Sequence, residues 1–414
     1  MDAQKLLPVA EARARVLAGA GPRGNERVPL AKALGRTLSE PLYAQRTQPP
    51  FRASAMDGFA LKAADLESLP ATLKLIGESA AGHGFTETLK RGEAVRIFTG
   101  APVPEGADAV LMQEDATLDG DTVTASRTVV EGRHIREIGI DFADGEVLLP
   151  AGTRLGPIDI ALAAAGGHSK VAVARKPRVA ILATGDELVQ PGEATSADQI
   201  VASNSFAIAA FVRQAGGEPI DLGIASDDFA ALETAVLAAR QAEADVLVTL
   251  GGASVGKHDL VQSALTNEGM ELVFWRIAMR PGKPLIHGRL PGPLGDMLIL
   301  GLPGNPASSI VCALLFLIPL LRALNGDPRA ADDPSEPAIL GAPMQPNGPR
   351  EDYLRAKLSR DTNGLLLATP HDVQDSSLLS VFAQSQCLLV RPPHAPVAAA
   401  GDACRVIKLS PALL

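Results

Sequence analysis

The sequence predicts a multidomain protein built around a parallel α/β sheet. The chain has 414 residues, which is more than one hydrophobic core usually organises, so two to four domains are expected. Residues 178–325 alternate short, continuously apolar runs with longer amphipathic runs, as strands and helices do in a parallel sheet covered on both faces. Short apolar runs separated by turn residues fill 51–144 and 354–409, which indicates a β-rich domain on each side of the α/β region.

Helices are expected at the N-terminus. Apolar residues within 6–16 recur near the 3.6-residue period, and residues 28–43 are interpreted as a second short helix. Residues 330–349 are rich in Pro, Gly, Ala and Asp and are interpreted as a linker. The other expected elements are strands at 71–76, 94–98, 109–112 and 122–125; a helix at 158–166; strands at 179–183, 220–224, 246–250, 272–277 and 298–300 that alternate with helices at 203–214, 229–242, 259–267 and 307–323; and strands at 354–358, 365–368, 387–390 and 404–409.

Composition argues against several classes of function. The formal net charge is −9 and aromatic residues make up only 3%, which disfavours a general nucleic-acid binder. Cys312, Cys387 and Cys404 form no CxxC pair, which disfavours a disulfide framework or a cysteine zinc site and suits a reducing, cytoplasmic compartment. The start of the chain lacks a signal-peptide layout, and the apolar run 307–321 is shorter than the roughly 20 residues of a membrane helix, so a buried helix of a soluble protein is expected.

Candidate binding residues follow every expected strand of the α/β region. In an open parallel sheet, ligands bind beyond the carboxyl ends of the strands. The residues at the five ends are, in chain order, Thr184, Gly185 and Glu187; Asp227; Gly251, Gly252, Ser254, Gly256 and Asp259; Arg276, Arg280 and Lys283; and Pro303, Gly304, Asn305 and Pro306. Each segment alone is also compatible with an ordinary turn or helix cap.

The five ends together indicate a phosphorylated ligand and a metal ion. Glycine-rich backbone and a helix start offer N–H groups to an anion, and three cations can neutralise it. Carboxylates fit around phosphate only when Mg²⁺ lies between them. The β-rich segment adds polar clusters at Asp57, Thr99, Arg136 and Asp141, each of which alone could be a plain loop. The histidines show no metal-ligand spacing, and no G-x-S-x-G element supports an α/β-hydrolase.

These segments resemble, in the same order, the MoeA family of molybdopterin molybdenumtransferases, to which the C-terminal domain of gephyrin is related. The matching segments are PFRASAMDGFA at 50–60, IFTGAP at 97–102, IREIGID at 135–141, ATGDEL at 183–188, GGASVGKHD at 251–259, PGKP at 281–284 and GLPGNP at 301–306. The resemblance covers essentially the whole chain.

The resemblance implies an elongated subunit of four domains. These would be a helical, discontinuous domain at 1–48 plus 145–177, a β-rich domain at 49–144, an α/β molybdopterin-binding domain at 178–328 and a C-terminal β-barrel at 329–414. It also implies a homodimer in which each cleft joins the α/β domain of one subunit to the β-rich domain of the other. Such a cleft would explain the polar clusters at Asp57, Thr99 and Asp141.

The implied reaction inserts molybdenum from molybdate into adenylylated molybdopterin with release of AMP, assisted by Mg²⁺. Asp227, Asp259 and Glu187 would bind the metal, and Glu187 and Asp57 are candidates for positioning water. The loop 251–256 and the helix start at Pro303–Pro306 would hold the pterin and phosphate groups. Arg276, Arg280 and Lys283 would neutralise phosphate or molybdate, Arg136, Thr99 and Asp141 would complete the cleft, and Ser376 matches a C-terminal position near it.

One departure and three alternatives accompany this interpretation. The family usually carries Lys at the positions of Arg276 and Arg280; Arg keeps the charge but cannot titrate, which puts a proton-donor role in doubt. The alternatives are the adenylyltransferase that resembles residues 178–328, a non-catalytic scaffold, and a tungsten-handling variant. An adenylyltransferase, molybdoenzymes or their chaperones are candidate partners; nucleic acid and membranes are not expected.

Overall fold

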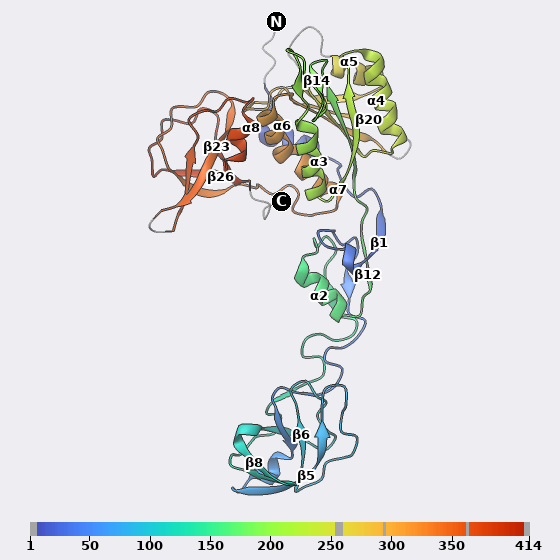
Figure 1. Cartoon of the computed structure of the whole chain (residues 1–414), viewed down its shortest axis with the longest axis vertical. Coiled ribbons are helices and arrows are strands. Elements are labelled where there is room, and N and C mark those ends of the chain that lie inside the picture. Colours follow the sequence, from blue (N-terminus) through green and yellow to red (C-terminus); the bar gives the residue numbers. More distant parts are fainter. Residues whose placement is uncertain (1–5, 253–259, 293–294, 362–363, 410–414) are drawn as a thin grey trace. The chain divides into compact units, whose positions relative to one another are not determined.

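The computed structural model describes residues 6–252, 260–292, 295–361 and 364–409. The chain forms two compact units (Figure 1). The first contains Met1–Glu26, Gly35–Ser39 and Val173–Leu414, and the second contains Arg27–Leu34 and Glu40–Ala172. Two of the predicted domains, the α/β region and the C-terminal barrel, lie in the first unit. The four domain boundaries remain predictions.

A six-stranded sheet forms the centre of the first unit, in the order β16-β13-β17-β21-β20-β18. Its strands are β13 (Arg178–Thr184), β16 (Glu218–Ala225), β17 (Val246–Leu250), β18 (Glu271–Phe274), β20 (Ile286–Leu290) and β21 (Met297–Leu302). Strands β16, β13, β17 and β21 are parallel. The expectation of a wholly parallel sheet is wrong at β20, which pairs antiparallel with both β21 and β18.

The sequence gives little signal for β20. Its residues IHGRL mix one histidine, one glycine and one arginine with two apolar residues, so neither an alternating nor a continuously apolar pattern appears. Because β20 reverses direction between its neighbours, β18 again runs the same way as β21. The carboxyl ends of all five predicted strands therefore lie at one edge of the sheet.

Helices cover both faces of this sheet, as the apolar strands require. Alternate residues of β13 pack on opposite sides: Val179 and Ile181 face one hydrophobic core, and Ala180 and Leu182 face the other. The first core is covered by α1 (Val9–Leu17), α3 (Asn204–Gln214), α6 (Pro306–Cys312) and α7 (Ile318–Leu324), and the second by α4 (Phe229–Gln241) and α5 (Leu260–Asn267).

The most apolar segment is a core helix. A π-helical turn, Ala313–Leu317, joins α6 to α7, so the helical run spans Pro306–Leu324. It is long and apolar enough to cross a membrane by composition, but 89% of the tested window is buried inside the protein. This agrees with the prediction of a buried helix.

A closed five-stranded barrel forms the C-terminal part of the first unit. Its strands are β22 (Glu336–Leu340), β23 (Glu351–Arg360), β24 (Leu366–Pro370), β25 (Cys387–Arg391) and β26 (Ala403–Lys408). Closure comes from β23, which pairs with both β24 and β25. A short strand, β19 (Met279–Arg280), adds to β23 and ties the segment after β18 to the barrel. One helix, α8 (Leu379–Ala383), follows β24.

The second unit contains a six-stranded sheet, β7-β4-β6-β5-β9-β8. The strands are β4 (Gly58–Leu61), β5 (Ala71–Ser79), β6 (Glu93–Ile97), β7 (Ala109–Met112), β8 (Ala116–Asp119) and β9 (Thr122–Ala125), with hydrophobic cores on both faces. Four of these match the strands expected from the sequence. Short pairs join β3 (Ala53–Ser54) to β10 (Ile135–Arg136) and β2 (Leu42–Tyr43) to β11 (Val147–Leu149), and α2 (Pro157–Ala165) confirms the predicted helix.

The prediction of a second N-terminal helix at 28–43 is wrong. The structure has β1 (Asn25–Pro29), which pairs with β12 (Lys170–Ala174), followed by one 3₁₀ turn at Leu30–Lys32. Proline disfavours a helical conformation in the residue before it, and Pro29 and Pro41 both lie in this segment. Gly35 adopts a positive φ of 73°, which ends any local helix.

Candidate functional site

The loops that follow β17 and β21 lie against each other at the carboxyl edge of the sheet. The Gly251 N–H donates to the Leu302 carbonyl at 3.1 Å. A Cβ at Gly304 would lie 3.5 Å from the Gly251 Cα. Thr184, at the end of β13, is buried and its hydroxyl donates to the Leu250 carbonyl at 3.4 Å. The predicted residues Thr184, Gly251 and Gly304 are therefore neighbours.

Glycine is required after β17 by both conformation and space. Gly251 and Gly252 have φ values of 96° and 66°, which residues other than glycine rarely adopt. A Cβ at Gly251 would lie 2.7 Å from the Thr184 carbonyl oxygen, and one at Gly252 would overlap the Val261 side chain. The other predicted residues of this loop, Ser254, Gly256 and Asp259, lie outside the described residues.

Three carboxylates gather at the ends of β13 and β16. The Glu187 carboxylate folds over Gly185, whose φ of 143° and missing Cβ leave room for it. Asp186 accepts the Asp227 backbone N–H at 3.1 Å. Partial burial, together with the charges of Asp186 and Glu187, raises the pKa of Asp227 above its ordinary value. This corner of the sheet therefore holds negative charge that no described cation neutralises.

Asp228 has a different task from its neighbour Asp227. It is the N-cap of α4 and accepts the Ala231 N–H at 2.8 Å. Hydrogen bonds from Ser226 and Ala231 lower its pKa. Among the described residues, no three His, Cys, Asp or Glu side chains are grouped so that they could hold a metal ion. Glu187 and Asp227 supply two carboxylates of the kind that Mg²⁺ prefers.

A cationic hollow of about 460 Å³ opens between the α/β region and the barrel. Three cations line it, Arg280, Lys283 and Arg350, and two of them were predicted from the sequence. The wall formed by the start of α6 contributes Asn305 and Ser308. The wall formed by the barrel contributes Tyr353, Gln374 and Ser376. Cations beside hydroxyl and amide donors favour a small oxyanion.

The two walls of the hollow are tied together by hydrogen bonds. The Asn305 amide donates to the Ser376 hydroxyl at 3.1 Å, and the Ala307 N–H donates to the Ser376 carbonyl at 3.0 Å. The first N–H of α6 is thus used within the protein, with Pro306 opening the helix before it. Pro303 is buried just before this turn.

The cations of the hollow are not equivalent. Arg280 forms an ion pair with Asp352, a carboxylate that is 4% exposed, so part of its charge is neutralised. Lys283 makes no ion pair among the described residues. Arg276 is not among the residues that line the hollow; its guanidinium stacks on the Trp275 ring, 3.8 Å from the centroid.

Replacement of Gly282 by alanine is expected to destabilise the protein by about 2–4 kcal/mol. Its φ is 123°, and a Cβ would lie 2.7 Å from the Met279 Cε and 2.8 Å from the Cys312 Sγ. Gly24, with a φ of 124° and no atom within 4 Å of a built Cβ, is the matched control. Urea unfolding should show a smaller loss for Gly24→Ala. Equal losses would mean that backbone strain alone matters at Gly282.

The second unit holds a separate polar cluster around Asp57. The Asp57 carboxylate accepts the backbone N–H of Thr99 at 2.7 Å and its hydroxyl at 2.8 Å. These bonds, with the charge of Arg96, lower the pKa of Asp57. Arg96, which the sequence did not single out, lies between the rings of Phe59 and Phe98, at 5.0 and 5.2 Å. Asp57 is therefore a fixed carboxylate.

Arg136 and Asp141 lie in the same unit as Asp57. Arg136 belongs to β10, opposite Ala53, and the Asp141 N–H donates to the Gln48 carbonyl at 3.1 Å. Within the described part of the chain, no hydrogen bond or ion pair joins either side chain to Asp57 or Thr99. The structure thus brings Asp57 and Thr99 together and leaves Arg136 and Asp141 exposed in the same unit.

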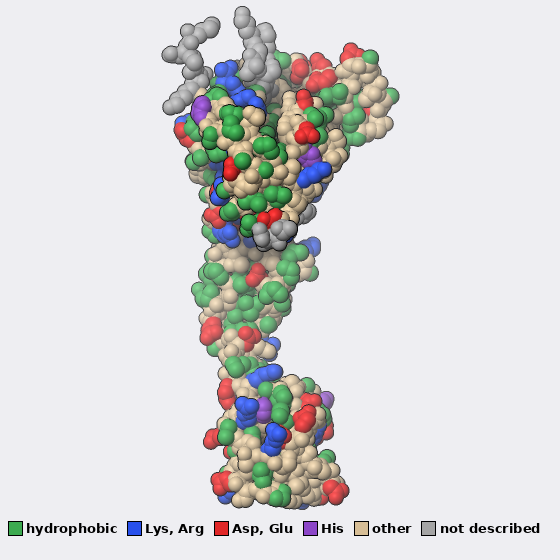
Figure 2. Space-filling view, turned by 90° about the vertical axis from the view of Figure 1, so that its left-hand side faces the viewer, with side chains coloured by type: hydrophobic (Ala, Val, Ile, Leu, Met, Phe, Trp, Pro, Cys, Tyr) green, Lys and Arg blue, Asp and Glu red, His purple; other side chains and the backbone are tan. Residues whose placement is uncertain are grey.

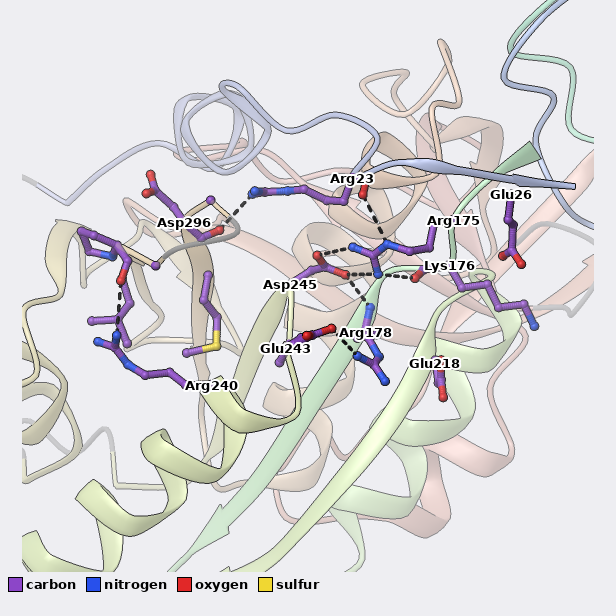
Figure 3. Close-up of a pocket in the computed structure, with 16 residues that line it drawn as sticks. Arg23, Glu26, Arg175, Lys176, Arg178, Glu218, Arg240, Glu243, Asp245 and Asp296 are labelled. Carbon is purple, nitrogen blue, oxygen red and sulfur yellow. Dashed lines mark hydrogen bonds and ion pairs between the residues drawn. The ribbon is translucent and has the colours of Figure 1, made fainter. Parts of the chain in front are cut away.

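A second cavity, of about 520 Å³, lies at the opposite edge of the sheet (Figure 3). It is lined by the start of β13, the start of β21 and the end of α4. Four of its charged groups form ion pairs within it: Asp245 faces Arg175, which donates to it at 3.0 and 2.8 Å, and Arg178 pairs with Glu243 at 3.1 Å. We interpret this cavity as a structural ion-pair cluster.

The Asp245→Asn variant is expected to lose about 2–3 kcal/mol of stability. Asp245 is 8% exposed and also accepts the Arg178 backbone N–H at 2.7 Å, so asparagine removes the counter-charge of Arg175 and replaces one of its two acceptor oxygens by an NH₂ group. Chemical denaturation measures the loss. Glu243→Gln breaks an exposed pair in the same cavity and should change stability by less than about 1 kcal/mol. A similar loss in both variants would contradict the role of burial.

Three protein-family models match successive parts of the chain. These are the MoeA N-terminal region (domain I and II) at residues 7–167, a probable molybdopterin binding domain at 180–323, and the MoeA C-terminal region (domain IV) at 337–409. Together they cover both units of the structure and the barrel.

Curated relatives and solved structures agree with these matches. The molybdopterin molybdenumtransferase of Haemophilus influenzae is 36% identical, over 89% of this chain and 90% of its own. That of Nostoc sp. is 38% identical, over 80% of this chain and 77% of its own. Two crystal structures of a molybdopterin biosynthesis MoeA protein from Pyrococcus horikoshii, at 31% and 29% identity, cover 98% of this chain and 100% of their own with TM-scores of 0.82. On these grounds the chain belongs to the MoeA family.

Proposed function

We propose that this chain is a molybdopterin molybdenumtransferase, which inserts molybdenum from molybdate into adenylylated molybdopterin and releases AMP. The observation that carries the proposal is the cationic hollow lined by Arg280, Lys283 and Arg350. Molybdate is a small tetrahedral dianion, and cations with nearby hydroxyl and amide donors suit it. The curated relatives are named for this transferase activity.

The carboxyl edge of the sheet would hold the rest of the substrate. Thr184, Gly251 and Gly304 lie together next to Asn305, which lines the hollow, and their backbone groups would hold the pterin and phosphate groups. Arg276 would add a cation beyond β18. The molybdenum and the pterin would therefore be bound from adjacent parts of one edge.

Mg²⁺ fits the acidic corner in this proposal. The raised pKa of Asp227 reflects its partial burial and repulsion by Asp186 and Glu187, and a bound cation would relieve the repulsion. Glu187, Asp227 and Asp259 would hold the ion, which would supply charge neutralisation at the phosphoanhydride. Glu187 is a candidate for orienting the attacking water. The water oxygen would bond to the adenylyl phosphorus while the bond from that phosphorus to the bridging oxygen breaks, so that AMP carries the water oxygen and the molybdopterin phosphate is the leaving group.

A homodimer is part of the proposal. The helix α2 has the sequence PIDIALAAA, with one charged residue and only Ala163 buried. A helix that is apolar on all sides is usually covered. Ile138, Ile140, Val147 and Ile158 are also exposed in this unit, and Figure 2 shows hydrophobic side chains gathered over this part of the chain. A second copy would cover them, and Asp57, Thr99, Arg136 and Asp141 of one copy would complete the cleft of the other.

The test is an assay with purified protein, adenylylated molybdopterin, Mg²⁺ and molybdate. AMP release together with molybdenum on the pterin supports the transferase, and Asp259→Ala should then abolish turnover. Binding of the adenylylated pterin without AMP release, under molybdate or tungstate, would instead support a scaffold. Faster turnover with tungstate would identify the tungsten-handling variant. A cytoplasmic location and transfer of the product to a molybdoenzyme or its chaperone belong to the same proposal.

A further inference from the structure

We propose that Arg355 is a positioning residue for the oxyanion hollow, acting through Gln374 and Ser376; the inference rests on the proposed function. Arg355 lies on β23, is 2% exposed, and is the largest fully buried side chain in the described part of the protein. It does not line the hollow itself. Its effect on an anion must therefore pass through the residues that it holds.

The guanidinium of Arg355 is bound to the loop that forms the barrel wall of the hollow. Its Nε donates to the Gln374 Oε1 at 3.3 Å, and its Nη1 donates to the Leu378 carbonyl at 3.1 Å. The two acceptors lie on either side of Ser376. Within the described ranges, no Asp or Glu lies within ion-pair distance of it.

Gln374 also holds this loop against β23. Its Oε1 also accepts the Arg355 backbone N–H at 3.0 Å, and its amide donates to the carbonyls of Arg355 and His371, both at 2.9 Å. Both polar atoms of the Gln374 side chain therefore bond to Arg355 on β23, and the amide also bonds to His371 at the start of the same loop. The side chain of Gln374 reaches the hollow in a single fixed orientation.

Ser376 is fixed from the opposite side. Its carbonyl and hydroxyl accept from Ala307 and Asn305 at the start of α6. The loop is thus held by Arg355 on the barrel and by α6 on the α/β region. Release of either anchor would let the Ser376 hydroxyl move relative to the cations across the hollow.

An arginine at this position is otherwise unfavourable. Burial of a charge without an ion pair is destabilising, although the charge of Asp375 partly compensates it here, and an apolar side chain of similar length would fill the space. The arginine provides two things that an apolar residue lacks: donors that reach both ends of the loop, and positive potential in a low-dielectric interior beneath an anion site.

The experiment measures molybdate binding to full-length protein by isothermal titration calorimetry, with thermal unfolding of every variant. Arg355→Met should raise the dissociation constant for molybdate about tenfold or more, which corresponds to about 1.4 kcal/mol. Arg355→Lys keeps the charge but cannot bridge both acceptors, so it should recover part of the loss. In a Ser376→Ala background, Arg355→Met should weaken binding by less than about threefold, because the group that it positions is already absent.

Arg391 is the matched control. It is a second buried barrel arginine, 8% exposed on β25, and its guanidinium donates to the carbonyls of Gln345 and Pro396. Arg391→Met should lower the melting temperature without weakening molybdate binding.

The outcomes separate this inference from the proposed function. Normal molybdate binding by Arg355→Met, when Lys283→Ala weakens binding, would overturn the positioning role alone. Absence of molybdate binding by the unaltered protein would overturn the hollow as an oxyanion site. Equal losses in Arg355→Met and Arg391→Met would mean that any damage to the barrel weakens the hollow, which also contradicts a specific role.

Discussion

The Asp227→Asn variant is expected to lose turnover by about a hundredfold or more while its fold becomes slightly more stable at neutral pH. Asp227 lies beside Asp186 and Glu187, and partial burial and these two charges raise its pKa. Asparagine removes a carboxylate that the proposed cation needs. It also removes a negative charge that destabilises the fold when no cation is bound.

The pH dependence follows from the direction of the pKa shift. A carboxyl group whose folded-state pKa is raised contributes stability below its unfolded-state pKa of 3.8, and that contribution is lost as the pH rises through the folded-state value. Above that value the ionised Asp227 is repelled by its neighbours. The melting temperature of Asp227→Asn should therefore exceed that of the unaltered protein at pH 7, and the difference should vanish at the acid end.

Asp228 provides the control for this prediction. Its carboxylate caps α4, so Asp228→Asn, which retains an oxygen acceptor, should change stability little and leave most of the turnover. Thermal unfolding in EDTA and steady-state AMP release in Mg²⁺ are the two measurements. If Asp227→Asn keeps its turnover, or melts at a lower temperature than the unaltered protein at pH 7, the acidic corner is not a cation site.

The carboxyl edge of the sheet was predictable because its signals are local. Each strand is a short apolar run, and the residues after it are glycines, carboxylates and cations that need no knowledge of distant pairing. Thr184, Gly251 and Gly304 meet at that edge because parallel strands end together. The antiparallel direction of β20 did not follow from the sequence. The five predicted strand ends still lie at one edge of the sheet, because β18 runs in the same direction as β21.

The barrel wall of the hollow was harder to predict. Arg350, Tyr353 and Gln374 approach Lys283 only because β19 adds to β23 and the barrel closes between β23 and β25. These pairings join residues far apart in sequence, and no local pattern encodes them. Ser376 was expected only through the resemblance. Arg355 gives no sequence signal either, because a buried arginine in a strand looks like an exposed one.

The secondary structure of the N-terminal segment depends on whether hydrophobic spacing or proline and glycine dominate locally. Residues 9–17 form a helix since Val9, Ala12 and Val16 share one face that packs into the core. Residues 28–43 also contain many apolar side chains, but Pro29 and Gly35 oppose a helix there. Proline and glycine therefore outweigh hydrophobic spacing in this segment.

Replacement of Lys283 by alanine is expected to raise the KM for molybdate by about 50-fold or more, with kcat at saturating molybdate reduced far less. Lys283 lines the hollow beside Arg280 and Arg350, but Arg280 is already paired with Asp352. Lys283 therefore contributes a full positive charge to the bound oxyanion. Because Lys283 is exposed and unpaired among the described residues, its removal should leave the melting temperature unchanged.

Two comparisons make this prediction specific. Lys176→Ala removes an exposed lysine from the cavity at the opposite edge of the sheet and should leave the KM unchanged. Arg280→Ala should weaken molybdate binding and also lower the melting temperature, because it leaves the buried Asp352 without its partner. The loss in Lys283→Ala should shrink at high salt, where screening already weakens the attraction. An unchanged KM in Lys283→Ala would contradict the role of Lys283 in molybdate binding, since the other two cations of the hollow would then suffice.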